Sequence, residues 1–411
     1  MKKLKIAQIA PLVESVPPQK YGGTERVVYS LCEELVKRGH EVTLFASGDS
    51  KSSAKLISVY PVHLRAAKIP DLYGTNDLTM LNIGTAYSMQ EEFDLIHDHC
   101  GSLSLASANI CRKPVLMTMH GPFTSYNRRI FEKLTNPGIV TISKAQARLA
   151  PAINHLGTVY HGLSMESYPF GAKSGNYLLF VGRISMEKGV HLAIEVAQYL
   201  NLPLIIAAKL DSVDMAYFNE YVGPKLSDNL IKWVGEVDEG ERNKLMKNAL
   251  CFLHPITWEE PFGLTLIEAM ACGCPVVAIG KGSVAEIVED GKTGFVVSDV
   301  YEMIEAVKNI DKIRRYTCRK HVLSNFNSRR MADEYEKIYD KLMQAEELQK
   351  EYSFEEQSLF RAENSGIHAE DETNLEARKR EPWPKECGNL FGQPLSLPSP
   401  GQQRFKIPLE S

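Results

Sequence analysis

Short apolar stretches alternate with amphipathic stretches along most of the chain. Residues 4–12 and 40–47 are apolar runs of strand length, and residues 23–39 between them carry apolar side chains at helical spacing. The same alternation returns over residues 93–163 and starts again at residue 177, continuing to residue 297. Apolar strands separated by helices are typical of parallel sheets covered by helices on both faces. The pattern therefore predicts an α/β fold.

The alternation is interrupted at residues 165–176, which are rich in Gly, Pro and Ser, and we predict a hinge there. A chain of 411 residues is also longer than a single hydrophobic core usually supports. We therefore predict two doubly wound domains, at residues 1–168 and 169–326, which face each other across a cleft. An amphipathic helix is predicted at residues 327–346. Residues 347–411 are polar, acidic and then proline-rich, and we predict that they are disordered.

The composition is that of a soluble globular protein, with 44% hydrophobic and 24% charged residues. The net charge of −4 gives no indication of a nucleic-acid partner. Basic residues outnumber acidic ones only in the first 170 residues. This excess is a weak indication that the N-terminal domain contacts an anionic partner or a membrane surface, and ordinary surface charge is the more common explanation.

The eight cysteines include no C-x-x-C pair, and several lie in apolar runs, as buried free thiols do. We therefore expect a reducing, cytoplasmic location and no structural metal. The basic N-terminus is followed by an apolar stretch too short for a signal peptide, and no run of about 18 apolar residues is long enough to span a membrane. Peripheral contact with the inner face of a membrane is compatible with this expectation.

Candidate binding residues follow predicted strands, where ligands of such folds bind. Gly22 and Gly23 precede the first helix, where backbone N–H groups can approach a phosphate. Arg183 and Lys188 follow the first strand of the second domain and suit a diphosphate. His120 ends a strand of the first domain and is expected to face the cleft. The alternatives are a plain glycine turn, two solvated surface charges and a core histidine.

The stretch WEEPFGLTLIEAMACGCPVVA, residues 258–278, is the most informative. It predicts a strand end, a loop and a helix start, so the N–H groups of residues 262–264 are unpaired and form an anion site. Glu260 lies in the loop and Glu268 one to two turns into the helix. Carboxylates accept hydrogen bonds from neighbouring sugar hydroxyls, so one acid suits a ribose and the other a hexose. The alternative for Glu268 is a capping box with Thr265.

Two further histidines, His97 and His99, alternate with Asp98 and therefore share one face of a strand. That face could line the acceptor side of the cleft. No third ligand in the sequence points to a metal site there.

Together, these residues resemble family 4 of the retaining GT-B glycosyltransferases. The resemblance covers roughly residues 3–342 and rests on YGGTERV, GRISMEKG and EEPFGLTLIEAMACGCPVVA. It implies a GT-B fold with two Rossmann-like domains and a last helix that crosses back to the first domain. It also implies transfer of a hexose-type sugar, with retention of configuration, from a nucleoside-diphosphate sugar, for which UDP or GDP is expected.

The resemblance also implies roles for particular residues. Arg183 and Lys188 would bind the diphosphate, Glu268 the ribose and Glu260 the hydroxyls of the donor sugar. His120 would contact the transferred sugar near the reaction centre. The remaining donor-site residues would line the sugar, the phosphates or the base, and they are Gly22, Gly23, Val237, Phe262, Gly263, Leu264 and Thr265. The catalytic set would comprise His120, Glu260, Arg183 and Lys188.

The sequence contains no D-x-D triplet, so we expect metal-independent transfer in which cations and a helix N-terminus stabilise the leaving diphosphate. No cofactor is expected beyond the nucleotide-sugar co-substrate. The acceptor, which the sequence does not identify, would be a glycan, a lipid-linked sugar or a small natural product. The alternatives are a nucleotide-sugar epimerase or a phosphorylase of the same fold, or a non-catalytic sugar-nucleotide-binding protein.

Overall fold

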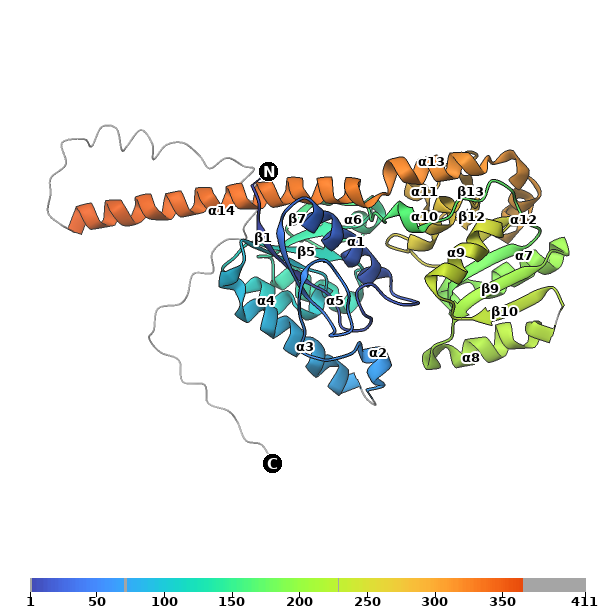
Figure 1. The fold of residues 1–411 in the computed structure, drawn as a ribbon, viewed down its shortest axis with the longest axis horizontal. Coiled ribbons are helices and arrows are strands. Elements are labelled where there is room, and N and C mark those ends of the chain that lie inside the picture. The colour runs from blue at the N-terminus through green and yellow to red at the C-terminus, as the bar shows by residue number, and fades with distance from the viewer. Residues whose placement is uncertain (1, 70–71, 228, 365–411) are drawn as a thin grey trace, which may run out of the picture.

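The structure is a computed structural model that describes residues 2–69, 72–227 and 229–364. It shows two α/β lobes side by side, with the long helix α14 running from the second lobe along the first (Figure 1). Each lobe is built on one parallel sheet. The predicted fold, with two doubly wound domains, is therefore confirmed.

The first sheet has seven strands in the order β3-β2-β1-β4-β5-β6-β7. Their bounds are β1 Lys5–Ile9, β2 Glu41–Phe45, β3 Lys55–Ile57, β4 Leu95–Asp98, β5 Val115–Met119, β6 Gly138–Thr141 and β7 His155–Thr158. The α-helices are α1 Gly23–Lys37, α2 Leu64–Ala67, α3 Leu72–Ser88, α4 Leu105–Asn109, α5 Ser125–Lys133 and α6 Lys144–Arg148. The order reverses at β1 and β4, so the loops after these two strands open at the crevice where such sheets bind ligands.

The second sheet has six strands in the order β10-β9-β8-β11-β12-β13. Their bounds are β8 Leu178–Arg183, β9 Leu204–Lys209, β10 Ile231–Gly235, β11 Cys251–His254, β12 Val276–Ile279 and β13 Gly294–Val297. The helices are α7 Val190–Leu200, α8 Met215–Tyr217, α9 Glu239–Asn248, α10 Leu264–Ala271, α11 Val284–Ile287, α12 Val300–Lys308, α13 Arg315–Asn325 and α14 Ser328–Asn364. Here the order reverses at β8 and β11.

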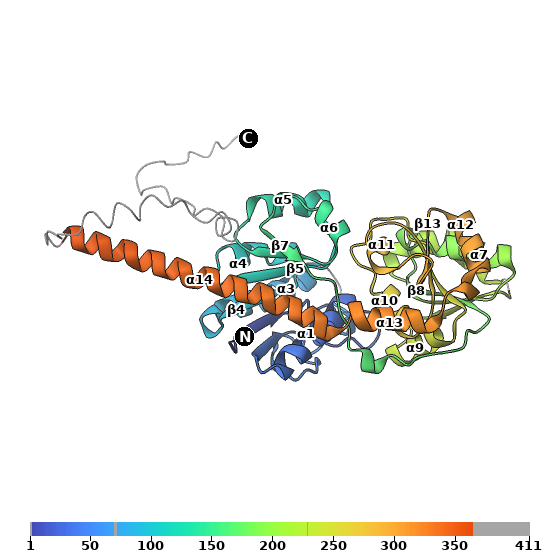
Figure 2. The ribbon, with the colours of Figure 1, turned by 90° about the horizontal axis from the view of Figure 1, so that it is seen from above.

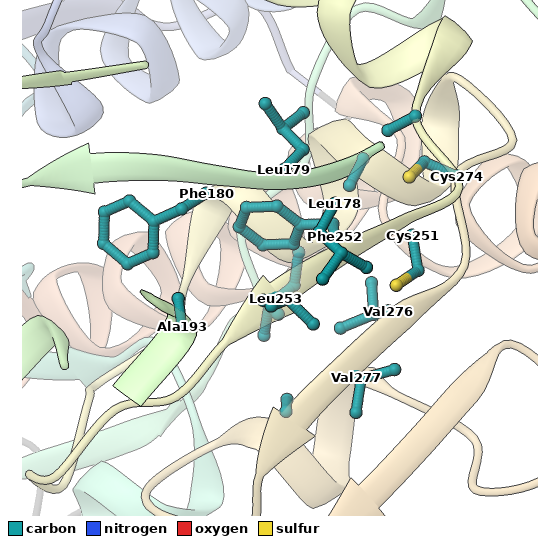
Figure 3. Packing of buried hydrophobic residues seen from close by; sticks show 14 of the residues in the cluster. Leu178, Leu179, Phe180, Ala193, Cys251, Phe252, Leu253, Cys274, Val276 and Val277 are labelled. Carbon is teal, nitrogen blue, oxygen red and sulfur yellow. The ribbon is translucent and has the colours of Figure 1, made fainter. Parts of the chain in front are cut away.

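The core of the second domain consists of apolar side chains from its central strands. Figure 3 shows Leu178, Leu179 and Phe180 of β8 near Phe252 and Leu253 of β11. All five side chains are buried. Because these strands carry apolar residues at successive positions, both faces of the sheet are covered, as a parallel sheet requires.

Helix α14 belongs to the core of the first domain although it follows the second domain in sequence. The buried residues Met331, Tyr335, Tyr339 and Leu342 pack in one cluster with side chains of α1 and the first sheet. In Figures 1 and 2 the helix lies along the first lobe and its end projects beyond that lobe. The helix therefore crosses back to the first domain, as expected.

Some elements differ from the prediction. The helix was predicted to end at residue 346, but α14 continues to Asn364, so the predicted disorder of the segment from residue 347 is wrong up to that point. Residues 347–364 are polar, yet they contain Glu, Gln, Leu and Lys, which are strong helix formers, and no Pro. The rest of the predicted tail, residues 365–411, lies outside the described residues. The short strand β3 and helix α3 were not predicted, because α3 contains two glycines and lacks a clear apolar stripe.

The predicted boundary at residues 168 and 169 falls in the connection between β7 and β8. Among the described helices, none has the combined length and apolarity that crossing a bilayer requires.

Candidate active site

A cavity of about 570 Å³ opens between the two domains. It is bounded by the loop after β1, the start of α1 and the end of β5 on one side, and by the ends of β8, β9 and β11 and the start of α10 on the other. This volume lies in the range of small-molecule sites. The cavity therefore lies at the carboxyl ends of central strands of both sheets.

All the predicted site residues line this cavity. From the first domain these are Gly22, Gly23 and His120, and from the second they are Arg183, Lys188, Val237, Glu260, Phe262, Gly263, Leu264, Thr265 and Glu268. The structure thus brings together residues from five separate sequence stretches. Their individual roles stay predictions.

Two helices begin at the cavity from opposite domains. Gly22 precedes α1 with a φ of +150°, and Gly263 precedes α10 with a φ of +81°, a region that L side chains rarely adopt. A Cβ at Gly23 would lie 3.2 Å from Leu264 Cδ1, so the two helix starts are in close contact. Both helix N-termini therefore face one interdomain space, which favours an anion.

The capping-box interpretation of Glu268 is wrong. Thr265 is the second residue of α10, and Gly263 is the N-cap without any side-chain cap hydrogen bond. Gly273 follows the C-terminal end of α10 with a φ of +81°, and its N–H donates to the carbonyl of Met270 over 2.9 Å.

The two predicted cations are each paired with acids in the cleft. Lys188 Nζ lies 2.7 Å from Glu260 Oε1, and only 17% of the Lys188 side chain is exposed. Arg183 forms an ion pair with Glu187, and its Nε lies 3.4 Å from Asp214 Oδ2. A diphosphate would therefore compete with carboxylates for these cations, which the sequence motif alone did not indicate.

Glu260 and its neighbour Glu259 have different surroundings in the structure. Glu259 is exposed and accepts a hydrogen bond from the Gly282 N–H, whereas the Glu260 side chain is 12% exposed and lines the cavity. Burial alone would raise the pKa of Glu260, but Lys188 and His254 lower it to about 2. Glu260 is thus a carboxylate at any physiological pH.

Glu268 lies at the centre of a buried cluster of polar side chains. Its Oε1 lies 3.1 Å from Arg242 Nη2, 3.2 Å from the Tyr168 hydroxyl and 3.5 Å from Arg26 Nε. Arg26 comes from α1 of the first domain and also pairs with Glu239 of the second. These three contacts are all made by Oε1 and tie the acid to side chains of both domains.

His120 and His161 form a stacked pair at the cleft, with ring centroids 5.0 Å apart and an interplanar angle of 24°. Both line the cavity, and neither Nδ1 atom has a hydrogen-bond partner among the described residues. Burial lowers the pKa of His120 to about 3 and also lowers that of His161. Both rings are therefore neutral and each offers one unpaired nitrogen.

Several cavity residues were not predicted. His161 follows strand β7, so the strand-end argument that identified His120 could have found it. His254 is the last residue of β11, so the same argument could have found it too. Arg26 and Arg242 carry no local signal, because their importance comes from partners far along the chain. The expectation that His97 and His99 line the acceptor side is wrong. Both are buried within the first domain, and neither lines the cavity.

Glu25 is another unpredicted residue, a 5% exposed acid in the first turn of α1 that also lines the cavity. Burial raises its pKa to about 7. Between roughly pH 4.5 and pH 7 the unfolded chain loses this proton while the folded chain retains it, so folding is increasingly disfavoured as the pH rises.

We therefore expect Glu25→Gln to be more stable than the wild type at pH 8, by up to about 3 kcal/mol, and equally stable at pH 4. Urea unfolding at both pH values measures this difference. Glu41→Gln, at an exposed position, is the control and should show no such pH-dependent gain. A Glu25→Gln variant whose advantage is the same at both pH values would contradict the raised pKa.

Comparison with known proteins identifies the family. The model described as glycosyl transferases group 1 matches residues 169–326, and the model described as glycosyltransferase family 4 matches residues 21–155. The chain belongs to the GT-B glycosyltransferases. The glycosyltransferase family predicted from the sequence motifs is therefore confirmed, and retention of configuration stays a prediction.

Among curated relatives, this glycosyltransferase is 26% identical over 327 residues to a phosphatidyl-myo-inositol mannosyltransferase of Mycobacterium tuberculosis, covering 72% of this chain and 82% of the relative. It is 22% identical over 397 residues to spore coat protein SA of Bacillus subtilis, covering 82% and 100% of the two chains. In both comparisons the aligned region covers most of the length of the relative.

Solved structures show the same fold. A sucrose-phosphate synthase from Thermosynechococcus elongatus aligns with a TM-score of 0.70 at 18% identity, covering 84% of this chain and all of the other. The HepE protein of Anabaena, in complex with UDP and glucose, aligns with a TM-score of 0.63 at 18% identity, covering 82% and 100%.

Proposed function

We propose that this glycosyltransferase transfers a hexose from a UDP- or GDP-sugar to an acceptor hydroxyl, with retention of configuration and without a metal ion. The observation that carries the proposal is the placement of two cations, two acids and two helix N-termini around one cavity. The complex of the similar HepE protein with UDP and glucose supports a nucleotide-sugar donor.

In this proposal the diphosphate lies at the start of α10. The free N–H groups there, together with Arg183 and Lys188, stabilise the charge that develops on the leaving phosphate. Glu268 Oε2 accepts from a ribose hydroxyl, while Oε1 is held by its arginine and tyrosine partners. Glu260 accepts from hydroxyls of the sugar. The transferring carbon then lies between the diphosphate and His120.

Retention follows if the acceptor hydroxyl attacks from the side of the leaving group. The phosphate oxygen that departs then takes the proton of the acceptor, so no separate protein base is required. The acceptor would enter along the first-domain side of the cavity, which is lined by Glu14, Tyr21 and Arg65. The similarity to phosphatidyl-myo-inositol mannosyltransferases makes lipid-linked acceptors one class to test, with peripheral membrane contact as the accompanying proposal.

Release of free nucleoside diphosphate from a panel of UDP- and GDP-hexoses tests this function. We expect one donor to raise the melting temperature and to release its nucleotide faster when a mixture of glycan, lipid-linked and small-molecule acceptors is added. Release should be unchanged in excess EDTA. Complete loss in EDTA that magnesium or manganese restores would contradict metal independence. A donor that binds but is only epimerised, or is cleaved only with inorganic phosphate, would favour the alternatives of the same fold.

A further inference from the structure

A buried row of hydrogen bonds runs beneath the cleft from His120 into the first sheet. His120 Nε2 lies 2.8 Å from His99 Nδ1, and His99 Nε2 lies 2.7 Å from Gln8 Oε1. Gln8 belongs to β1, while His99 and His120 follow β4 and β5, so the three side chains come from neighbouring strands. Gln8 and His99 are buried, and neither lines the cavity.

The amide of Gln8 determines which group donates and which accepts in each hydrogen bond of this row. An amide oxygen only accepts hydrogen bonds, so His99 must carry its hydrogen on Nε2. Burial lowers the pKa of His99 well below its usual range, and the ring is therefore neutral with a bare Nδ1. That bare nitrogen accepts from His120, which must carry its own hydrogen on Nε2. His120 is neutral too, and its Nδ1 is left bare and unpaired.

The amide nitrogen of Gln8 lies near two groups that can accept its hydrogens. Gln8 Nε2 lies 3.4 Å from the hydroxyl of Tyr339 and 3.3 Å from His97 Nδ1. The Tyr339 hydroxyl lies 2.7 Å from the same His97 nitrogen. Tyr339 is on α14, so the helix that crosses back from the second domain helps to hold the amide in this orientation.

We propose that Gln8 and His99 are positioning residues that hold His120 in the tautomer with a hydrogen on Nε2 and a bare Nδ1. The role of the bare nitrogen rests on the proposed function: it accepts a hydrogen bond from a hydroxyl of the transferred sugar. If the Gln8 amide were turned round, every step would reverse and His120 would carry an N–H on Nδ1 instead. The orientation of one buried amide thus sets whether the ring accepts from the sugar or donates to it.

Long-range ¹H–¹⁵N NMR of the full-length, ligand-free protein labelled with ¹⁵N-histidine tests the tautomer directly. The His120 signals are assigned by their loss in His120→Gln. In the wild type we expect a protonated Nε2 and a bare Nδ1. This measurement requires no variant beyond the assignment and no substrate, so it stands whether or not transfer is observed.

Gln8→Met removes the amide while keeping a similar side-chain size. We expect the His120 signals to shift towards a mixture of tautomers, and kcat with the active nucleotide sugar to fall about tenfold while KM changes little. Thr141→Val is the matched control. Thr141 is equally buried and hydrogen-bonds His155 Nε2 at 3.0 Å, outside the Gln8–His99–His120 row and outside the cavity lining. This variant should keep the wild-type His120 signals and kcat.

A protonated Nδ1 in the wild type would overturn the proposal. So would Gln8→Met with wild-type His120 signals and kcat, or an equal loss in Thr141→Val, which would show a merely structural effect. A bare Nδ1 in a protein that turns over no nucleotide sugar would leave the tautomer assignment standing and contradict the proposed function instead.

Discussion

Replacing Lys188 with alanine is expected to weaken binding of UDP or GDP by thirtyfold to several thousandfold. Lys188 is largely buried, pairs with Glu260 and sits 5.3 Å from the Trp258 ring, so its charge is held in the cavity. Removal of one desolvated charged partner typically costs about 2–5 kcal/mol, which corresponds to this range. Arg183→Ala should have the same direction and a smaller effect, because the Arg183 side chain is 33% exposed. Isothermal titration calorimetry with the free nucleoside diphosphates measures both.

Loss of Lys188 also leaves Glu260 without its partner, so a binding loss must be separated from a folding defect. Urea unfolding of each variant gives the change in stability, and titrations are compared only where the protein is folded. Lys232→Ala removes an exposed lysine of β10 that lies outside the cavity and should leave affinity unchanged. Wild-type affinity in both Lys188→Ala and Arg183→Ala would show that neither residue binds the diphosphate.

The sequence predicted these two cations because their positions follow from topology alone. In a parallel sheet, residues after the central strands lie at one edge, so Arg183 at the end of β8 had to face the cleft. The anion site at the start of α10 was predictable for a similar reason, since a helix begins with unpaired N–H groups whatever surrounds it. Strand ends and helix starts read from the sequence were sufficient wherever the direction of the backbone alone determined where a site residue lies.

Side-chain partners across long sequence separations could not be predicted in this way. Arg26 and Glu268 lie in different domains, and their contact depends on how the domains are placed relative to each other. The strand period correctly placed His97 and His99 on one face, but their partners depend on β1 being the neighbour of β4. Strand β1 supplies Gln8, which hydrogen-bonds both histidines, so the face that was expected to bind a ligand is part of a buried network.

The amino-acid composition also led to a wrong prediction of where the ordered part of the chain ends. The segment after residue 346 has the polarity of a disordered tail, yet α14 continues through it to Asn364. Helix propensity and polarity give opposite predictions here, and polarity was given too much weight. The buried half of α14 was predictable, because residues such as Tyr335 and Tyr339 recur at helical spacing.

Substitutions of the two acids in residues 258–278, Glu260 and Glu268, are expected to have different effects. Glu268→Gln should weaken the donor and the free nucleoside diphosphate alike, because both carry the ribose. Glu260→Gln should leave nucleoside diphosphate affinity unchanged or slightly tighter, because Lys188 is then free for the phosphate, and it should reduce kcat. A hydrogen bond to a charged group contributes roughly 1.5–3 kcal/mol, so each loss should be about ten- to a hundredfold. Calorimetry with the nucleoside diphosphate and initial rates with the donor measure the two effects.

Glu268 also holds Arg26 and Arg242, so its variant needs a control that disturbs the same arginines. Glu239→Gln provides it, because Glu239 pairs with Arg26 and lies 4.0 Å from Arg242 but does not line the cavity. If Glu268 binds the ribose, Glu239→Gln should lower stability and retain nucleoside diphosphate affinity within a fewfold. Equal affinity losses in Glu239→Gln and Glu268→Gln would mean that the arginine cluster matters only for closing the domains. Small, equal losses of nucleoside diphosphate affinity in Glu260→Gln and Glu268→Gln would indicate that both acids have only a structural role.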